Sequence, residues 1–208
     1  MTWLDSLRVH EKVENVTKEG NLLKITTKDN RPELLSLSNF SEKLSGRLLQ
    51  TLLNTYNFNF LLCNKKNYFL DEEAIRLLKQ HNISFGTGGD LFRLLNDSTT
   101  TYSNFINKDS EYIIKNLSNN YNVKSFQLAS NRKFIVQRHK GRSITFVFIN
   151  EYAVTQERIN EMYELYAPFD YILVADPNGR FKDYQYNGQE VQIGLWASLF
   201  SFLVNPKS

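Results

Sequence analysis

Residues 131–152, NRKFIVQRHKGRSITFVFINEY, decide the fold of this chain. Two runs rich in β-branched and aromatic residues, 133–138 and 143–154, lie on either side of a short basic turn. Such runs, bounded by turn residues, are typical of paired strands. A similar run at 123–128 precedes them, so the sequence predicts three consecutive strands.

Helical patterns flank these strands. One helix is predicted from Asp109, and a second begins at Thr155, whose hydroxyl suits the N-cap position. The second helix has apolar residues at positions i, i+3, i+4 and i+7, namely Ile159, Met162, Tyr163 and Tyr166. A buried strand at 171–175 and an apolar helix at 191–203 follow. The second half therefore reads α-β-β-β-α-β-α, and the chain is predicted to be an α/β protein with a mixed sheet flanked by helices.

The first half also alternates strand and helix signals. Short strands are predicted at 21–27 and 33–38, and the apolar run 58–63 predicts a strand covered on both faces. Ser41 is placed as the N-cap of the helix before that run, and Asp71 as the N-cap of the helix after it. Residues 1–20, which are polar and charged, are expected to form a short helix or a loosely held arm.

The best candidate for a domain boundary is the Ser/Thr run at 98–101. It divides the chain into an N-terminal α/β region, 1–98, and a second α/β domain, 99–208. One continuous domain is the alternative. No internal repeat is visible in the sequence.

The composition excludes several classes of protein. Cys63 is the only cysteine, so neither an internal disulfide nor a Cys/His zinc site is expected. The longest apolar tract, 195–204, is half of the roughly 20 residues that a membrane span needs. With no secretory signal at the N-terminus, the expectation is a soluble, cytoplasmic protein without a membrane partner. The net charge of +3 is weak evidence for a polyanionic partner.

The order α-β-β-β-α-β over residues 109–176 resembles the restriction-endonuclease-like PD-(D/E)xK superfamily. The resemblance implies a Mg²⁺-dependent nuclease centre. Its enzymes hold the metal with an Asp at the start of the second strand and a Glu on the third, and a Lys follows two residues after that Glu. The metal activates water and neutralises the phosphate that is cleaved.

In this sequence the residues at those positions differ from the family's pattern. Strand alternation places Asn131 where the Asp is expected, Asn150 in place of the Glu and Tyr152 in place of the Lys. An amide is a neutral donor and cannot replace a carboxylate in a Mg²⁺ site without a large loss of affinity. The resemblance therefore implies a degenerate nuclease-like domain with no metal and no cofactor. The alternative is an active Mg²⁺ nuclease that uses Glu111 and Glu151, with Asp90 as a more distant third acid.

The segment 124–142 contains cations and no acidic residue. If its strands pair, basic side chains gather near the hairpin tip and could meet the phosphates of DNA or RNA with little sequence preference. The candidate phosphate contacts are Lys133, Arg138, Lys140 and Arg142. The alternative is an ordinary charged edge that discourages strand-to-strand aggregation, or a surface that contacts a protein partner.

Two loops are candidates for small-ligand binding. The first contains Gly86, Gly88, Gly89 and Asp90, between a predicted strand and a helix, where free N–H groups can hold an anion. It lacks the Lys-Ser/Thr pair of a phosphate-binding P-loop, and Asp90 is placed as a helix N-cap. The second loop contains Asp176 and Asn178 directly after a buried strand. The favoured interpretation of each loop is a tight turn without a ligand.

Overall fold

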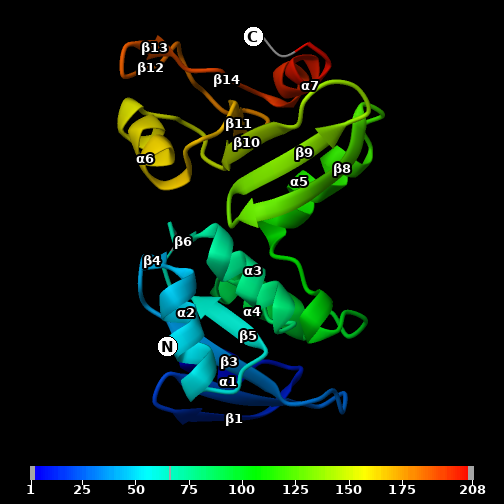
Figure 1. Ribbon diagram of the computed structural model, residues 1–208. Coiled ribbons are helices and arrows are strands. Elements are labelled where there is room, and N and C mark those ends of the chain that lie inside the picture. The colour runs from blue at the N-terminus through cyan, green and yellow to red at the C-terminus, as the bar shows by residue number, and fades with distance from the viewer. Residues whose placement is uncertain (1–2, 66, 206–208) are drawn as a thin grey trace. The chain divides into compact units, whose positions relative to one another are not determined.

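The structure, a computed structural model, describes residues 3–65 and 67–205 (Figure 1). The chain divides into two compact units, Met1–Lys108 and Asp109–Ser208, called unit 1 and unit 2 below. The division falls after Lys108 rather than after residue 98 because the segment beyond the Ser/Thr run belongs to the first core. Tyr102 and Phe105 are buried there, and Ser84 Oγ donates a hydrogen bond to the Phe105 carbonyl at 3.1 Å.

Unit 1 is built on a five-stranded sheet in the order β1-β2-β3-β5-β7. Strands β1, β2 and β3 are antiparallel, whereas β3, β5 and β7 are parallel. A separate short ladder joins β4 to β6. The elements are α1 (Trp3–Arg8), β1 (Val13–Glu19), β2 (Leu22–Thr27), β3 (Leu34–Asn39), β4 (Lys43–Leu44), α2 (Gly46–Thr55), β5 (Phe60–Cys63), β6 (Phe69–Leu70), α3 (Glu72–Gln80), β7 (Ser84–Gly86), α4 (Gly88–Asn96) and the 3₁₀ turn η1 (Tyr102–Asn104).

Unit 2 has a five-stranded sheet in the order β14-β11-β10-β9-β8. Strands β8, β9 and β10 are antiparallel, and β10, β11 and β14 are parallel. The elements are α5 (Lys108–Ser118), β8 (Val123–Ser130), β9 (Lys133–Arg138), β10 (Ile144–Ile149), α6 (Gln156–Tyr166), β11 (Tyr171–Val174), β12 (Gln185–Tyr186), β13 (Gln189–Glu190), β14 (Ile193–Gly194) and α7 (Trp196–Val204). The predicted order α-β-β-β-α-β-α is present, with a small β12-β13 hairpin and the edge strand β14 added.

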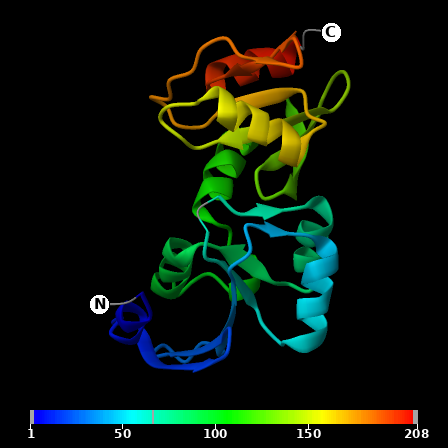
Figure 2. The same cartoon turned by 90° about the vertical axis from the view of Figure 1, so that its left-hand side faces the viewer.

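Helices cover both faces of each sheet. In unit 1, α4 packs on the face formed by Phe60 and Leu62, and Figure 2 shows α2 on the opposite side of this sheet. In unit 2, α5 and α7 pack on the face that carries Phe134 and Phe146, and α6 lies on the other side (Figure 1). Side-chain alternation along the strands explains the two apolar faces, since every buried strand supplies both.

The two units share one topology, although the sequence shows no repeat. Each has a helix, an antiparallel three-stranded meander, a helix, two further parallel strands and a final helix. Between the two parallel strands, unit 1 has β6 and the helix α3, whereas unit 2 has the β12-β13 hairpin. The first strand of each meander has an irregularity at its start, between Val13 and Asn15 in unit 1 and between Val123 and Ser125 in unit 2. Strand β8 has a second one, between Leu128 and Ser130. The fold is therefore duplicated within the chain.

Side-chain hydrogen bonds recur at equivalent places and support the duplication. Asn59 Oδ1, just before β5, accepts from the Leu35 N–H at 2.9 Å. In unit 2, Asp170 Oδ2, just before β11, accepts from the Thr145 N–H at 2.7 Å. Both acceptors tie the start of the first parallel strand to the second residue of its neighbour. The sequence hides the repeat because these positions share a chemical role rather than an identical residue.

Several predicted element ends are corrected by the structure. The N-cap of α2 is Ser45, which accepts from the Leu48 N–H, and not Ser41. Ser41 is displaced from this role because β4 keeps the chain extended up to the cap. The N-cap of α4 is Thr87 and not Asp90, which occupies the third helical position of a capping box. The early polar region forms α1 and the strand β1.

Within the described residues, no helix combines the length and the apolar character needed to cross a membrane.

Candidate functional site

The site predicted in unit 2 lies where β9 begins and β10 ends, at one edge of the sheet. Asn131 is in the turn between β8 and β9 and is 4% exposed. Its Oδ1 accepts a hydrogen bond from the Tyr166 hydroxyl of α6 at 3.3 Å. The amide therefore has a defined position inside the unit, at the place where the resemblance implies a metal-binding Asp.

Asn150 follows β10 directly and is exposed. Its Nδ2 donates to Asp109 Oδ1 in the first turn of α5 at 2.9 Å. Asn131 and Asn150 are thus bonded to different helices, α6 and α5. Tyr152, at the position of the expected Lys, is 49% exposed, and the Arg180 guanidinium carbon lies 5.1 Å from its ring centre. The amide positions are built into hydrogen bonds of the fold rather than directed together at one ligand.

The acids proposed for an active nuclease are also placed apart. Glu151 forms an ion pair with Arg158 of α6, with its Oε1 3.0 Å from the arginine Nε. Arg158 pairs in addition with Glu161. Glu111 is exposed on α5, on the opposite side of the sheet from α6. Among residues 3–65 and 67–205, no three His, Cys, Asp or Glu side chains are grouped so that they could hold a metal ion.

Three buried cations lie at or near this edge of the sheet. Arg132, Lys133 and Arg158 are exposed by only 9%, 7% and 7%. The Arg132 guanidinium carbon lies 5.7 Å from the centre of the Phe148 ring. Burial raises the pKa of Tyr166 to about 12, and the neighbouring Arg132 and Arg158 oppose that rise.

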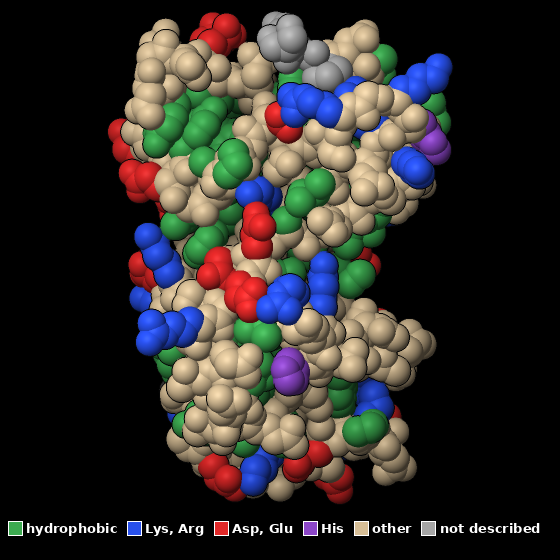
Figure 3. Space-filling view, viewed as in Figure 1, with side chains coloured by type: hydrophobic (Ala, Val, Ile, Leu, Met, Phe, Trp, Pro, Cys, Tyr) green, Lys and Arg blue, Asp and Glu red, His purple; other side chains and the backbone are tan. Residues whose placement is uncertain are grey.

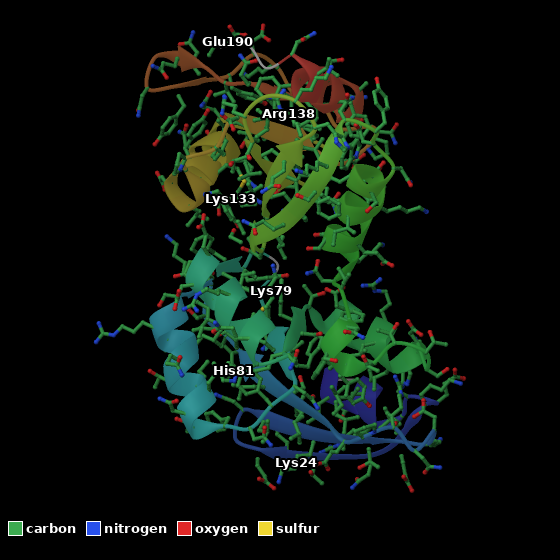
Figure 4. All side chains as sticks on the ribbon, turned by 45° about the vertical axis from the view of Figure 1, so that its right-hand side comes forward. Lys24, Lys79, His81, Lys133, Arg138 and Glu190 are labelled. Carbon is green, nitrogen blue, oxygen red and sulfur yellow. The ribbon has the colours of Figure 1, made fainter. Side chains whose placement is uncertain are left out.

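Lys133 and Arg138, two of the predicted phosphate contacts, lie at opposite ends of β9 (Figure 4). Lys133 is buried at the start of the strand. Arg138 donates from Nη1 to the Leu203 carbonyl and from Nε to the Arg142 carbonyl, both at 2.8 Å. Arg142 itself forms an ion pair with Asp170 at 2.7 Å. The structure therefore gives Arg138 and Arg142 partners within unit 2 and leaves Lys133 buried.

Lys140 remains as an exposed cation at the hairpin tip. His139 beside it and Lys124 on the neighbouring strand β8 are exposed too. Lys124 belongs to the same end of the sheet because the His139 N–H donates to the Asn122 carbonyl at 3.2 Å. Figure 3 shows cationic side chains and a histidine together at the upper right edge of the molecule. This exposed group, Lys124, His139 and Lys140, is called the tip cluster below.

The glycine loop of unit 1 is filled by its own aspartate. Asp90 Oδ2 accepts from the Thr87 N–H at 2.9 Å and Asp90 Oδ1 from the Lys108 N–H at 2.8 Å. The carboxylate thus occupies the helix end that an anion would need. A Cβ at Gly88 would lie 2.7 Å from Trp3 Nε1, which explains the glycine by close packing. Gly86 ends β7, and Gly89 lies in the first turn of α4.

The second predicted loop is a β-turn in unit 2. Asp176 Oδ1 accepts from the Asn178 N–H at 2.8 Å, and the Gly179 N–H donates to the Asp176 carbonyl at 3.0 Å. The side chain of Asp176 is therefore used to close the turn. The glycine loop and this turn belong to different units.

Sequence reasoning missed the buried arginines, although a signal was present. Arg158 lies four residues before Met162 and eight before Tyr166, so it falls on the apolar stripe of α6. A cation on such a stripe must either be paired or act on a ligand. Arg132 had no comparable signal, since turn residues are usually exposed.

Comparisons of the chain with protein-family models, with curated proteins and with solved structures found no match. The comparisons therefore assign neither a family nor a function to the chain.

Proposed function

We propose that this chain is a nucleic-acid-associated protein whose second unit is a nuclease-like domain without a catalytic metal centre. The support for a restriction-endonuclease-like fold is topological. The order α5-β8-β9-β10-α6-β11, with an antiparallel meander followed by a parallel strand, matches the order that the resemblance implies.

The observation that carries the proposal is the chemistry at the start of β9. Magnesium requires anionic oxygen ligands. The chain presents a buried amide, Asn131, followed by two buried cations, Arg132 and Lys133. This edge is suited to hold phosphate oxygens and not to hold the divalent metal that would activate water against them. Unit 2 would therefore bind a nucleic acid and leave it intact.

The tip cluster supplies the outer contact. Its side chains are exposed, whereas Arg138 and Arg142 are engaged within the unit. Contacts between lysines and phosphates release counterions, so binding falls as salt rises and depends little on sequence. Each phosphate contact contributes about 0.9 to the slope of log K against log salt for duplex DNA.

The test measures binding of labelled DNA and RNA by anisotropy over a range of KCl concentrations. Replacing Lys124 and Lys140 by Gln should weaken binding and reduce the slope by about 2. The matched control replaces two exposed lysines of unit 1, Lys18 and Lys28, by Gln and keeps the same net charge as the test variant. Equal slopes for the two variants would remove the tip cluster from the interface, and no binding by the wild type would end the proposal.

A further inference from the structure

A cavity opens in unit 2 beside β14, the edge strand that leads into α7 (Figure 1). Its volume is about 470 Å³, a size common among ligand sites. The walls come from the first residue of β11, the start of β14 and one face of α7. The lining includes Tyr171, Gln192, Ser198, Ser201, Phe202 and Asn205. None of these side chains carries a charge at neutral pH.

The pairing of the strands identifies the same place in unit 1. Phe60 and Tyr171 are the first residues of the equivalent strands β5 and β11. Ser84 of β7 pairs with Phe60. The register of β14 on β11, extended by one residue, places Gln192 opposite Tyr171. Ser84 in unit 1 therefore corresponds to Gln192 in the wall of the cavity.

The helices that follow these strands correspond in the same way. Gly86 ends β7 and Gly194 ends β14, and the next residue in each unit is the N-cap of the last helix. A Cβ at Gly86 would lie 2.6 Å from Asp90 Cβ, and a Cβ at Gly194 would lie 2.7 Å from Ser198 Cβ. Asp90 of α4 therefore corresponds to Ser198 of α7. The next positions correspond in pairs: Arg93 with Ser201 and Leu94 with Phe202.

In unit 1 the strand positions hold a stretch of the chain's own backbone, residues 99–108. Ser84 Oγ donates hydrogen bonds to the carbonyls of Tyr102 and Phe105. The centre of the Phe105 ring lies 6.0 Å from the centre of the Phe60 ring. Tyr102 and Phe105 are both buried, so this stretch is part of the core of unit 1.

The helix positions of unit 1 hold the same stretch. The Arg93 guanidinium carbon lies 4.7 Å from the centre of the Phe105 ring, and Arg93 Nη2 donates to the Ile106 carbonyl. Asp90 Oδ1 accepts from the Lys108 N–H at 2.8 Å. Four positions of unit 1 that correspond to lining residues of the cavity thus bind one piece of backbone and its aromatic ring.

We infer that the cavity beside β14 binds an extended, uncharged peptide segment of a partner protein, with one aromatic side chain inside the cavity. Unit 1 fills this place with residues 99–108, whereas among the described residues of unit 2 it is open. Tyr171 and Phe202, whose ring centres are 5.0 Å apart, offer an apolar wall to an aromatic ring. The Gln192 amide, at the place of Ser84, can donate to a peptide carbonyl. Since the lining is neutral, the segment needs no charge.

The first test uses the full chain and a peptide with blocked ends that copies residues 99–107, TTTYSNFIN, which contain no charged residue. In NMR spectra of the isotope-labelled chain, this peptide should cause saturable shifts of the backbone amide signals around the cavity, those of Ile193, Gly194 and Ser201. The same peptide with Tyr102→Ser and Phe105→Ser should cause none. The inference is overturned by an absence of shifts, by shifts confined to unit 1, or by equal shifts with both peptides.

A gain of affinity tests the correspondence between the units, because misfolding cannot produce one. Ser201→Arg copies Arg93, which lies over the Phe105 ring in unit 1. This variant should bind the peptide about fivefold more tightly than the wild type does. Ala197→Arg is the matched control, since Ala197 is exposed on the same helix and is not a lining residue. Equal affinities for the two variants would refute the assignment.

Salt distinguishes this site from the proposed function, beyond which it goes. The affinity for the uncharged peptide should change little as KCl is raised, whereas nucleic-acid binding falls. Peptide binding by a chain that binds neither DNA nor RNA would refute the proposed function and support the inference, and nucleic-acid binding without peptide binding would do the reverse. Self-association of the wild type that Ser201→Trp abolishes in sedimentation would assign the cavity to a second copy and overturn the assignment to a partner protein.

Discussion

Arg138 of unit 2 is best understood as a cap for the last helix, and this leads to a sharp prediction about stability. Its two hydrogen bonds, at 2.8 Å each, run to the carbonyls of Leu203 in the last turn of α7 and of Arg142 across the hairpin. Helix C-termini leave carbonyls without intrahelical partners, and a cation there also interacts favourably with the helix dipole. Arg138→Met retains the apolar stem and removes both bonds.

The magnitude follows from the setting of each bond. A hydrogen bond with a charged partner contributes about 1.5–3 kcal/mol. The bond to Leu203 is part-buried and counts in full, whereas the bond to Arg142 is exposed and counts for little. We expect Arg138→Met to lower the free energy of unfolding of unit 2 by about 2 kcal/mol. For a domain of this size that is a fall in melting temperature of about 10 °C.

Differential scanning calorimetry measures the effect, because it can follow the two units as separate transitions. Lys140→Met is the matched control: it removes a cation two residues away that is exposed. A surface substitution of that kind should change the free energy of unfolding by no more than about 0.5 kcal/mol. If Arg138→Met melts at the same temperature as Lys140→Met, then the carbonyl bonds do not stabilise α7 and the reasoning fails.

Three further predictions follow from single contacts. Burial raises the pKa of the Cys63 thiol, so a disulfide reagent should leave it unmodified in the native protein at neutral pH and react once the chain is denatured. Hydrogen bonds from Thr100 and Thr99 lower the pKa of Asp97 in the folded state. Asp97 therefore stabilises the folded state fully above its unfolded pKa of about 3.9, and this stabilisation is lost as the pH falls through the folded pKa. Asp97→Asn should melt below the wild type at neutral pH, and the two melting temperatures should converge in acid. Glu151→Gln should destabilise unit 2 because Arg158 loses one of its ion-pair partners. In Mg²⁺ or Mn²⁺, cleavage of DNA and RNA should be the same for this variant and the wild type. A nuclease activity that the wild type has and the variant lacks would favour the active-enzyme alternative.

The element order of unit 2 could be predicted because its signals are local. The apolar stripe of α6 and the Thr155 cap are both present in the structure. The element ends in unit 1 were harder, since they depend on partners distant in sequence. Ser41 has the chemistry of a cap, but Lys43 and Leu44 pair with Phe69 and Leu70 and so delay the helix.

The candidate site was less predictable than the fold. The positions of Asn131 and Asn150 follow from strand alternation, but their hydrogen-bond partners on α6 and α5 do not. The internal use of Arg138 was also hidden, because its acceptor, Leu203, is 65 residues away. The charge of a residue alone could not distinguish a cation that binds phosphate from one that caps a helix.

Comparison of the two units makes that distinction for Arg138. In unit 1, Arg31 lies in the hairpin between β2 and β3 and donates to the carbonyls of Leu94, Leu95 and Asp97 at the end of α4. In unit 2, Arg138 at the end of β9 donates to the Leu203 carbonyl of α7, so in each unit an arginine in or beside the second hairpin of the meander bonds to the end of the last helix. A contact that recurs in both units is therefore assigned to the stability of the fold rather than to the binding of a ligand.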